Sequence, residues 1–298
     1  MIRIELSIAL SYEVDEHGAD FVFNIQAAHT ACQAVHNEQL VISQAVPTRT
    51  HADPASGNRY LRLRAQPGPL ALNYSATVDL NHHRTDPADV AEVPVCDLPA
   101  EVLGYIYPSR YCQSDRLVQF AIREFGALPQ GHRRVQAICD WVRSRVSFMS
   151  NTSNANTSAV DTLIEQRGVC RDFAHLMIAL RRAVSIPARF ATGTDYGADP
   201  ALGPPDFHAY VEVYLGHRWY LFDPSGTAIP MGLVRLGTGR DAADVAFATI
   251  FGSVTSLAPW IRAHAVDDAV RGFELPRPAA QALSTDPGAL SPPAAAGS

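Results

Sequence analysis

A cysteine at the start of a predicted helix is the residue of this sequence best placed for covalent chemistry. Cys170 follows Gly168, and the residues after it carry an apolar stripe with helical spacing that ends before Pro187, formed by Phe173, Leu176, Met177, Leu180 and Val184. The free N–H groups and the dipole at a helix N-terminus favour an anion, so a thiolate is stabilised there and becomes a nucleophile. The backbone N–H of Cys170 is also placed to bind an oxyanion. The alternative is a cysteine with a purely structural role.

Two histidines are candidates for the base that a nucleophilic cysteine needs. His175 lies five residues after Cys170, about 140° around the helix, so we expect it to point away from the thiol and to have a supporting role. Asp172 is close enough in sequence to hydrogen-bond His175. We therefore expect Asp172 and His175 to lie beside the site rather than in it. We expect the same of Tyr210, which lies in the predicted strand 207–215.

His208 is the better candidate, because it lies in a predicted β-hairpin. Residues 207–215 and 218–223 have the composition of strands, and Gly216-His217 between them predicts a tight turn. In that register His208 is the diagonal neighbour of Asp223 on one face, where Cβ atoms lie about 7–8 Å apart or less. Asp223 can then fix the imidazole tautomer and leave the other nitrogen to the thiol. The alternative is a surface pair, since Asp223-Pro224-Ser225-Gly226 is also a plain turn signal.

The elements that must position these residues suggest an α+β protein. Residues 1–95 contain short strands separated by turns, beginning with the alternation of Ile2, Ile4, Leu6 and Ile8, and predict a β-sandwich-like domain. Residues 96–270 contain helical stripes and the two predicted strands, so we assign them to the core that carries Cys170. Residues 271–298 are rich in Pro, Ala, Ser and Gly and predict a disordered tail.

The bulk properties are those of an ordinary globular protein. The chain has 298 residues, 47% apolar and 18% charged, with a net charge of −6, so nothing indicates nucleic-acid or lipid binding. The N-terminus lacks the pattern of a signal peptide and no apolar run is long enough to span a membrane, so we expect a cytoplasmic location. The five cysteines are widely spaced, which argues against a zinc site or a disulfide framework. We expect no metal and no cofactor.

Three ordered motifs resemble the transglutaminase-like superfamily in its bacterial branch. These are Gly168-Val169-Cys170-Arg171-Asp172-Phe173-Ala174-His175-Leu176, then His208-Ala209-Tyr210, then Asp223-Pro224-Ser225. Residues 186–190 also resemble a strand of that family, and residues 1–95 resemble its β-rich N-terminal domain. Tyr210 replaces a usual tryptophan, Ser225 a usual threonine, and Phe148 an upstream tyrosine that could have donated to an oxyanion.

The resemblance implies a papain-like core with the nucleophile at a helix N-terminus and the His and Asp on an antiparallel sheet. It implies a catalytic triad of Cys170, His208 and Asp223 that acts on a peptide or protein substrate through a thioester. We favour hydrolysis, as in a protease or amidase. A glutamine transglutaminase with an amine acceptor, and a non-catalytic peptide-binding module on the same fold, stay open. The Gly- and Pro-rich loop 193–206 is a candidate border of the cleft, and the oligomeric state cannot be read from the sequence.

Overall fold

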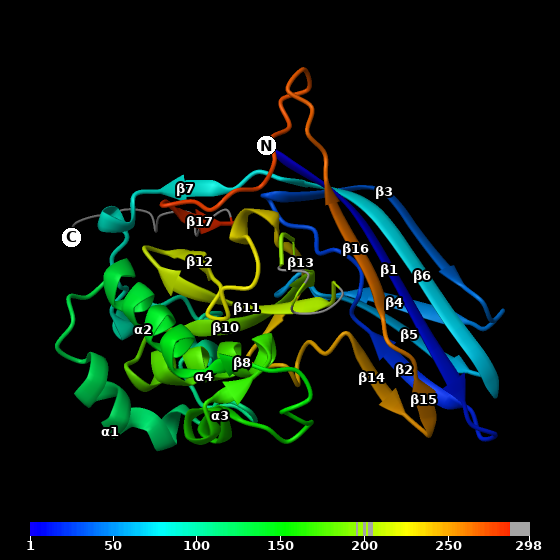
Figure 1. The fold of residues 1–298 in the computed structure, drawn as a ribbon, viewed down its shortest axis with the longest axis horizontal. Coiled ribbons are helices and arrows are strands. Elements are labelled where there is room, and N and C mark those ends of the chain that lie inside the picture. The colour runs from blue at the N-terminus through cyan, green and yellow to red at the C-terminus, as the bar shows by residue number, and fades with distance from the viewer. Residues whose placement is uncertain (195, 199–200, 202–204, 287–298) are drawn as a thin grey trace, which may run out of the picture.

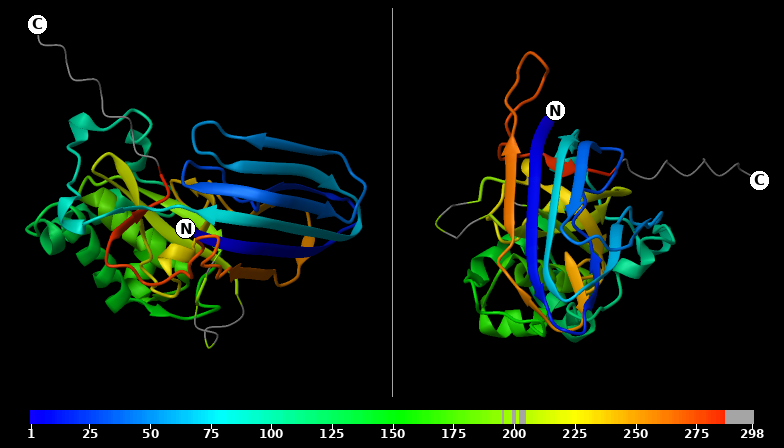
Figure 2. Two further views of the ribbon diagram at one scale, coloured as in Figure 1. Left: turned by 90° about the horizontal axis from the view of Figure 1, so that it is seen from above. Right: turned by 90° about the vertical axis from the view of Figure 1, so that its right-hand side faces the viewer.

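The computed structural model describes residues 1–194, 196–198, 201 and 205–286, and shows the expected α+β architecture. A two-sheet sandwich lies on one side of the molecule and a sheet covered by helices on the other, as Figure 1 and the left view of Figure 2 show. None of the helices within this described part is long and apolar enough to cross a membrane.

The N-terminal strands form most of the sandwich. They are β1 (Ile2–Val14), β2 (Ala19–Phe23), β3 (Gln33–Ile42), β4 (Thr48–Ala52), β5 (Arg59–Ala65) and β6 (Gly68–Leu80). β1 and β6 pair antiparallel along their whole length, from Ile2 opposite Leu80 to Val14 opposite Gly68. The alternation seen in the sequence sets the faces, because the even-numbered residues of β1 are buried between the sheets while Arg3 and Glu5 face outward.

Three strands late in the chain return to the sandwich. β14 (Ala248–Phe251) pairs with β2, while β15 (Val254–Ser256) and β16 (Trp260–Ala265) both pair with β1. The sheet orders are β15-β1-β6-β3, with β16 also on β1, and β14-β2-β5-β4. Residues 248–265 therefore complete the sandwich, whereas the sequence had placed them with the catalytic core. Alternation identifies a strand but not its partner, which is why the sequence could not assign them.

Part of the predicted tail is also ordered. β17 (Ala282–Ser284) pairs with β7 (His83–Thr85), so disorder does not begin at residue 271. Its side chains are buried, which anchors this segment against the core. Residues 287–298, the rest of that predicted tail, lie outside the described part of the chain.

The second half contains the helices and a four-stranded sheet. The helices are α1 (Ser114–Phe125), α2 (His132–Arg145), α3 (Ala159–Glu165) and α4 (Cys170–Ala183). The strands are β8 (Ser147–Phe148), β9 (Arg167–Gly168), β10 (Ala188–Thr194), β11 (Phe207–Leu215), β12 (Arg218–Phe222) and β13 (Val234–Gly239). Short 3₁₀ segments span Pro87–Asp89, Val95–Asp97, Leu103–Tyr105 and Pro230–Gly232. The sheet order is β12-β11-β10-β13.

α4 is the central helix of this half. Its residues from Asp172 to Ala183 are all buried, and it packs with α1, α2 and α3 and against β10 and β11. Of the apolar stripe predicted from the sequence, Phe173, Leu176, Met177 and Leu180 are thus fully buried, whereas Val184 follows the last helical residue and is half-buried. Pro187 follows the end of the helix and leads into β10.

The β11–β12 hairpin has the predicted register. Leu215 opposes Arg218, and the pairs continue to Val211 opposite Phe222. Gly216 and His217 both have positive φ, 50° and 60°, as a two-residue hairpin turn that matches the strand twist requires. Asp223 therefore comes directly after β12, one step beyond the last pair.

Candidate active site

Cys170 is the first residue of α4, and its placement depends on Asp172. The carboxylate of Asp172 turns back and accepts a hydrogen bond of 2.8 Å from the N–H of Val169, which fixes the entry into the helix. Gly168 makes room for this turn, since a Cβ there would lie 2.6 Å from the Cβ of Asp172. Gly168 pairs with Phe148 in the short β8–β9 ladder, which places Phe148 beside the helix start.

His208 and Asp223 come together as the hairpin register requires. His208 Nε2 lies 3.3 Å from Asp223 Oδ1, and both side chains are almost completely buried. The contact has the length of an ion pair rather than a short, well-aligned hydrogen bond, a geometry common in sites without substrate. With Nε2 directed to Asp223, Nδ1 is left for the thiol of Cys170, which also interacts with the ring.

The carboxylate of Asp223 is held on both oxygens. Oδ1 accepts hydrogen bonds from the backbone N–H and the hydroxyl of Ser225, at 3.0 and 2.6 Å. Oδ2 accepts one from the N–H of Ala228 at 3.1 Å. Arg143 donates to the backbone carbonyl of Asp223 at 2.7 Å, so α2 fixes the chain at the same point.

These contacts keep both groups of the pair charged. Burial opposes ionisation of Asp223, but the charge of His208 and the hydrogen bonds lower its pKa to about 2. Burial also opposes the imidazolium, yet Asp223 and then Cys170 raise the pKa of His208 well above its ordinary value of 6.5. The site therefore favours an imidazolium beside the thiol at neutral pH.

The thiol of Cys170 is half-buried, and its Sγ lies 3.9 Å from the carbonyl oxygen of Phe207, the residue before His208. The other cysteines, all free, have different surroundings. Burial raises the pKa of Cys112 and Cys139 to about 12, while Cys96 is exposed in a 3₁₀ segment.

His175 lies outside this group. It is fully buried and stacks on Tyr111 with ring centroids 5.0 Å apart. Its Nε2 accepts a hydrogen bond of 3.2 Å from the N–H of Ala242. Burial lowers the pKa of His175 well below 6.5, so the ring is neutral. The expected contact with Asp172 is absent among the hydrogen bonds of the described residues, because that carboxylate caps the helix and faces Arg171 instead.

Tyr210 shares the face of His208 but not its surroundings. It is buried in the core that joins the sandwich to the second half, and burial raises the pKa of its phenol further. Its ring lies against Gly193 in β10. Tyr210 therefore contributes packing behind the site.

Sequence reasoning missed the groups that hold Asp223, namely Ser225, Ala228 and Arg143. An Asp-Pro-Ser sequence is a signal for a side-chain turn, so the Ser225 contact was available in principle. The Arg143 contact depends on how α2 packs and had no local signal. Within the part of the chain that the structure describes, no group of three or more His, Cys, Asp or Glu side chains is arranged to hold a metal ion.

Comparisons with known proteins identify the family. Residues 121–224 match the transglutaminase-like superfamily, and residues 2–101 match the bacterial transglutaminase N-terminal domain. A crystal structure of a "putative cysteine protease" from Cytophaga hutchinsonii is 37% identical, with a TM-score of 0.86, and the match covers 95% of this chain and 97% of that one. This chain belongs to the transglutaminase-like superfamily and carries its bacterial N-terminal domain.

Curated relatives are matched over part of their length. An uncharacterized protein of Mycobacterium leprae is 29% identical over 163 residues, which are 53% of this chain and 57% of that protein. An uncharacterized protein of Mycobacterium tuberculosis is 30% identical over 143 residues, 42% of this chain and 45% of that protein. The chain thus spans about half the length of the curated relatives that it matches.

Proposed function

We propose that this protein is a cysteine-dependent amide hydrolase, a protease or amidase, with Cys170, His208 and Asp223 as its triad. The observation that carries the proposal is the buried ion pair of His208 and Asp223 beside a thiol at a helix N-terminus. The likeness to the structure described as a "putative cysteine protease" supports it. The substrate class that we propose is a peptide or protein.

The chemistry follows from the positions of these groups. The Cys170 thiolate attacks the amide carbonyl carbon, and the electron pair of the C=O bond moves to oxygen, where the N–H of Cys170 is available to stabilise it. When the tetrahedral intermediate collapses, the C–N bond breaks and the His208 imidazolium gives its proton to the leaving amine. The product is a thioester and a neutral imidazole.

The second half of the cycle uses the same residues. His208 removes a proton from water, the hydroxide attacks the thioester carbonyl, and the C–S bond breaks to release a carboxylic acid and the thiolate. Asp223 stabilises the imidazolium in both halves and stays ionised. Hydrolysis needs no dedicated site for the acceptor, whereas transamidation needs one for an amine.

Unfolded casein, incubated with and without a fluorescent primary amine, tests the proposal. A hydrolase produces new peptide N-termini, detected by mass spectrometry, and incorporates little amine. A transglutaminase attaches the amine to glutamine side chains. Both activities must disappear in Cys170→Ala. A wild-type protein that gives neither product, and whose Cys170 is no more reactive than Cys96, would point instead to a binding module on this fold.

A further inference from the structure

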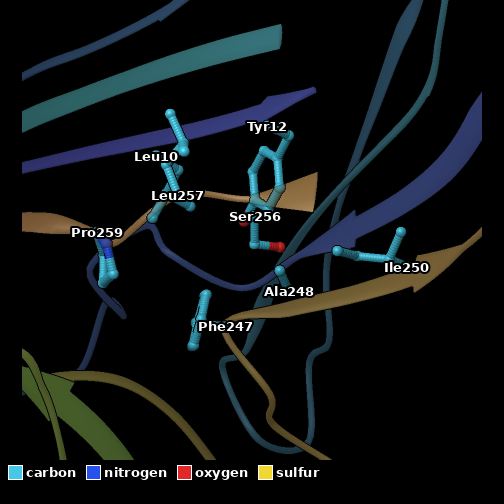
Figure 3. A pocket seen from close by; sticks show the side chains of 8 residues that line it. All are labelled: Leu10, Tyr12, Phe247, Ala248, Ile250, Ser256, Leu257 and Pro259. Atoms are coloured by element: carbon cyan, nitrogen blue, oxygen red, sulfur yellow. The ribbon is translucent and has the colours of Figure 1, made fainter. Parts of the chain in front are cut away.

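A hollow lined mainly by apolar side chains opens in the sandwich beside the segment that enters β14. It has a volume of about 220 Å³ and is walled mainly by Leu10, Tyr12, Phe247, Ala248, Ile250 and Leu257. Figure 3 shows these side chains around it, with the hydroxyl of Ser256 among them, between Tyr12 and Ala248. Leu257 is 62% exposed at the rim, so the hollow is open to solvent.

The hollow exists because an edge strand is interrupted. β16 pairs with β1 as far as Ala9, and β15 resumes pairing at Tyr12. Leu257 still donates to the carbonyl of Ser11 at 3.0 Å, but Pro259 has no N–H to donate, and both residues line the hollow beside Leu10. On the facing sheet β14 begins with the small side chain of Ala248, which leaves the space unfilled.

The wall of the hollow is continuous with the candidate active site. The ring of Phe247 stacks on the ring of Phe207, with centroids 4.3 Å apart. The carbonyl oxygen of Phe207 lies 3.9 Å from Cys170 Sγ, and His208 is the next residue. In Figure 1 the segment that precedes β14 crosses from the helical side of the molecule to the sandwich. The two stacked rings therefore lie between the hollow and the segment that carries His208.

We infer that this hollow is a specificity subsite that binds an apolar side chain of the peptide substrate. The inference rests on the proposed function and names a feature of its substrate. An apolar cavity of about 150 Å³ accommodates benzene, so the hollow is large enough for a leucine or phenylalanine side chain. It is smaller than the roughly 300 Å³ at which pockets for whole small molecules begin. The N-terminal domain thus takes part in substrate selection.

Peptides with a central chloroacetyl side chain test the inference. Each peptide carries a single leucine, or an asparagine of similar shape, at one of the four positions before or after the chloroacetyl residue. An extended chain advances about 3.3 Å per residue, so this series samples a range of distances from Cys170. The measured quantity is the rate of Cys170 alkylation by each peptide, divided by the rate with iodoacetamide for the same variant. We expect leucine to raise this ratio about tenfold or more over asparagine at one position.

Two variants and one matched control test whether the preference for leucine over asparagine arises from the hollow. Ala248→Phe fills the hollow and Leu257→Asp places a charge at its exposed rim, so both should reduce the leucine preference to about twofold or less. Thr249→Phe adds the same ring on the opposite, exposed face of β14 and should keep the preference.

No leucine preference at any position, or a preference that survives both variants, would overturn the inference while leaving the proposed function standing. If Cys170 reacted with iodoacetamide no faster than Cys96, the proposed function itself would be wrong, and the inference that rests on it would fail as well.

Discussion

Asp223 illustrates how a single residue controls the charge state of the site. Its carboxylate is buried, yet it accepts hydrogen bonds from Ser225 and Ala228 and faces His208. An ionised carboxylate in this setting holds the imidazole ring in one orientation and stabilises its protonated form. The reactivity of Cys170 should therefore depend on a residue that does not touch the sulfur.

Asp223→Asn should lower both alkylation of Cys170 and stability, with a defined pH dependence. The pKa of Asp223 in the folded protein, about 2, lies below its ordinary value, so its stabilising effect is complete above about pH 4 and disappears as the pH falls through 2. The pKa of His208 is raised, so its effect is complete below about pH 6.5 and is lost as the pH rises through the folded value. The free energies of unfolding of wild type and variant should differ most, by about 2 kcal/mol, between about pH 4 and pH 6.5. Urea unfolding at several pH values measures this, and a difference independent of pH would contradict it.

At the scale of elements, the start of α4 is built around one close contact. The Asp172 side chain caps the helix while lying against residue 168. Residue 168 is a glycine, and a Cβ at that position would clash with the Asp172 side chain. The cap and the glycine together determine where the first helical residue, Cys170, stands relative to the β11–β12 hairpin. A small shift of this helix end would separate the thiol from His208.

Gly168→Ala should therefore impair the site as well as the stability of the fold. The new methyl group would force the Asp172 side chain aside, which should cost about 1–3 kcal/mol and slow alkylation of Cys170 about tenfold or more. Gly104→Ala is a matched control, because a Cβ at that position has no atom within 4 Å. Equal alkylation rates for Gly168→Ala and wild type would show that the contact does not position the thiol.

At the scale of the whole molecule, the two halves share a core. Ala191, Tyr210, Leu233 and Leu236 of the second half are buried in the same cluster as the strands of the sandwich. β14–β16 also return to the sandwich after the catalytic sheet is complete. Unfolding either half would expose this shared surface, so we expect a single cooperative transition.

Leu236→Ala should weaken both halves together. Removing this fully buried side chain should cost about 2–5 kcal/mol. Hydrogen exchange, followed by mass spectrometry, should show amides of β1 and of α4 losing protection by the same factor. Protection lost in α4 alone would mean that the halves unfold separately.

Much of the local structure could be predicted from the sequence, and the long-range pairing could not. The start of α4 and the hairpin turn at Gly216-His217 have strong local signals, and they determined the spacing of His208 and Asp223. The return of residues 248–265 to the sandwich had no such signal, because alternation says nothing of which strand lies alongside. Phe247, which joins the hollow to the site, depends on that return.

The central claim, an activated thiol at Cys170, is tested most directly by alkylation with iodoacetamide across pH, with each cysteine followed by peptide mass spectrometry. The account predicts that at about pH 6, well below the ordinary thiol pKa of about 8.5, Cys170 reacts faster than the exposed Cys96. It also predicts that His208→Ala removes this advantage while leaving Cys96 unchanged. Equal rates for Cys170 and Cys96, or an advantage that persists without His208, would contradict the account.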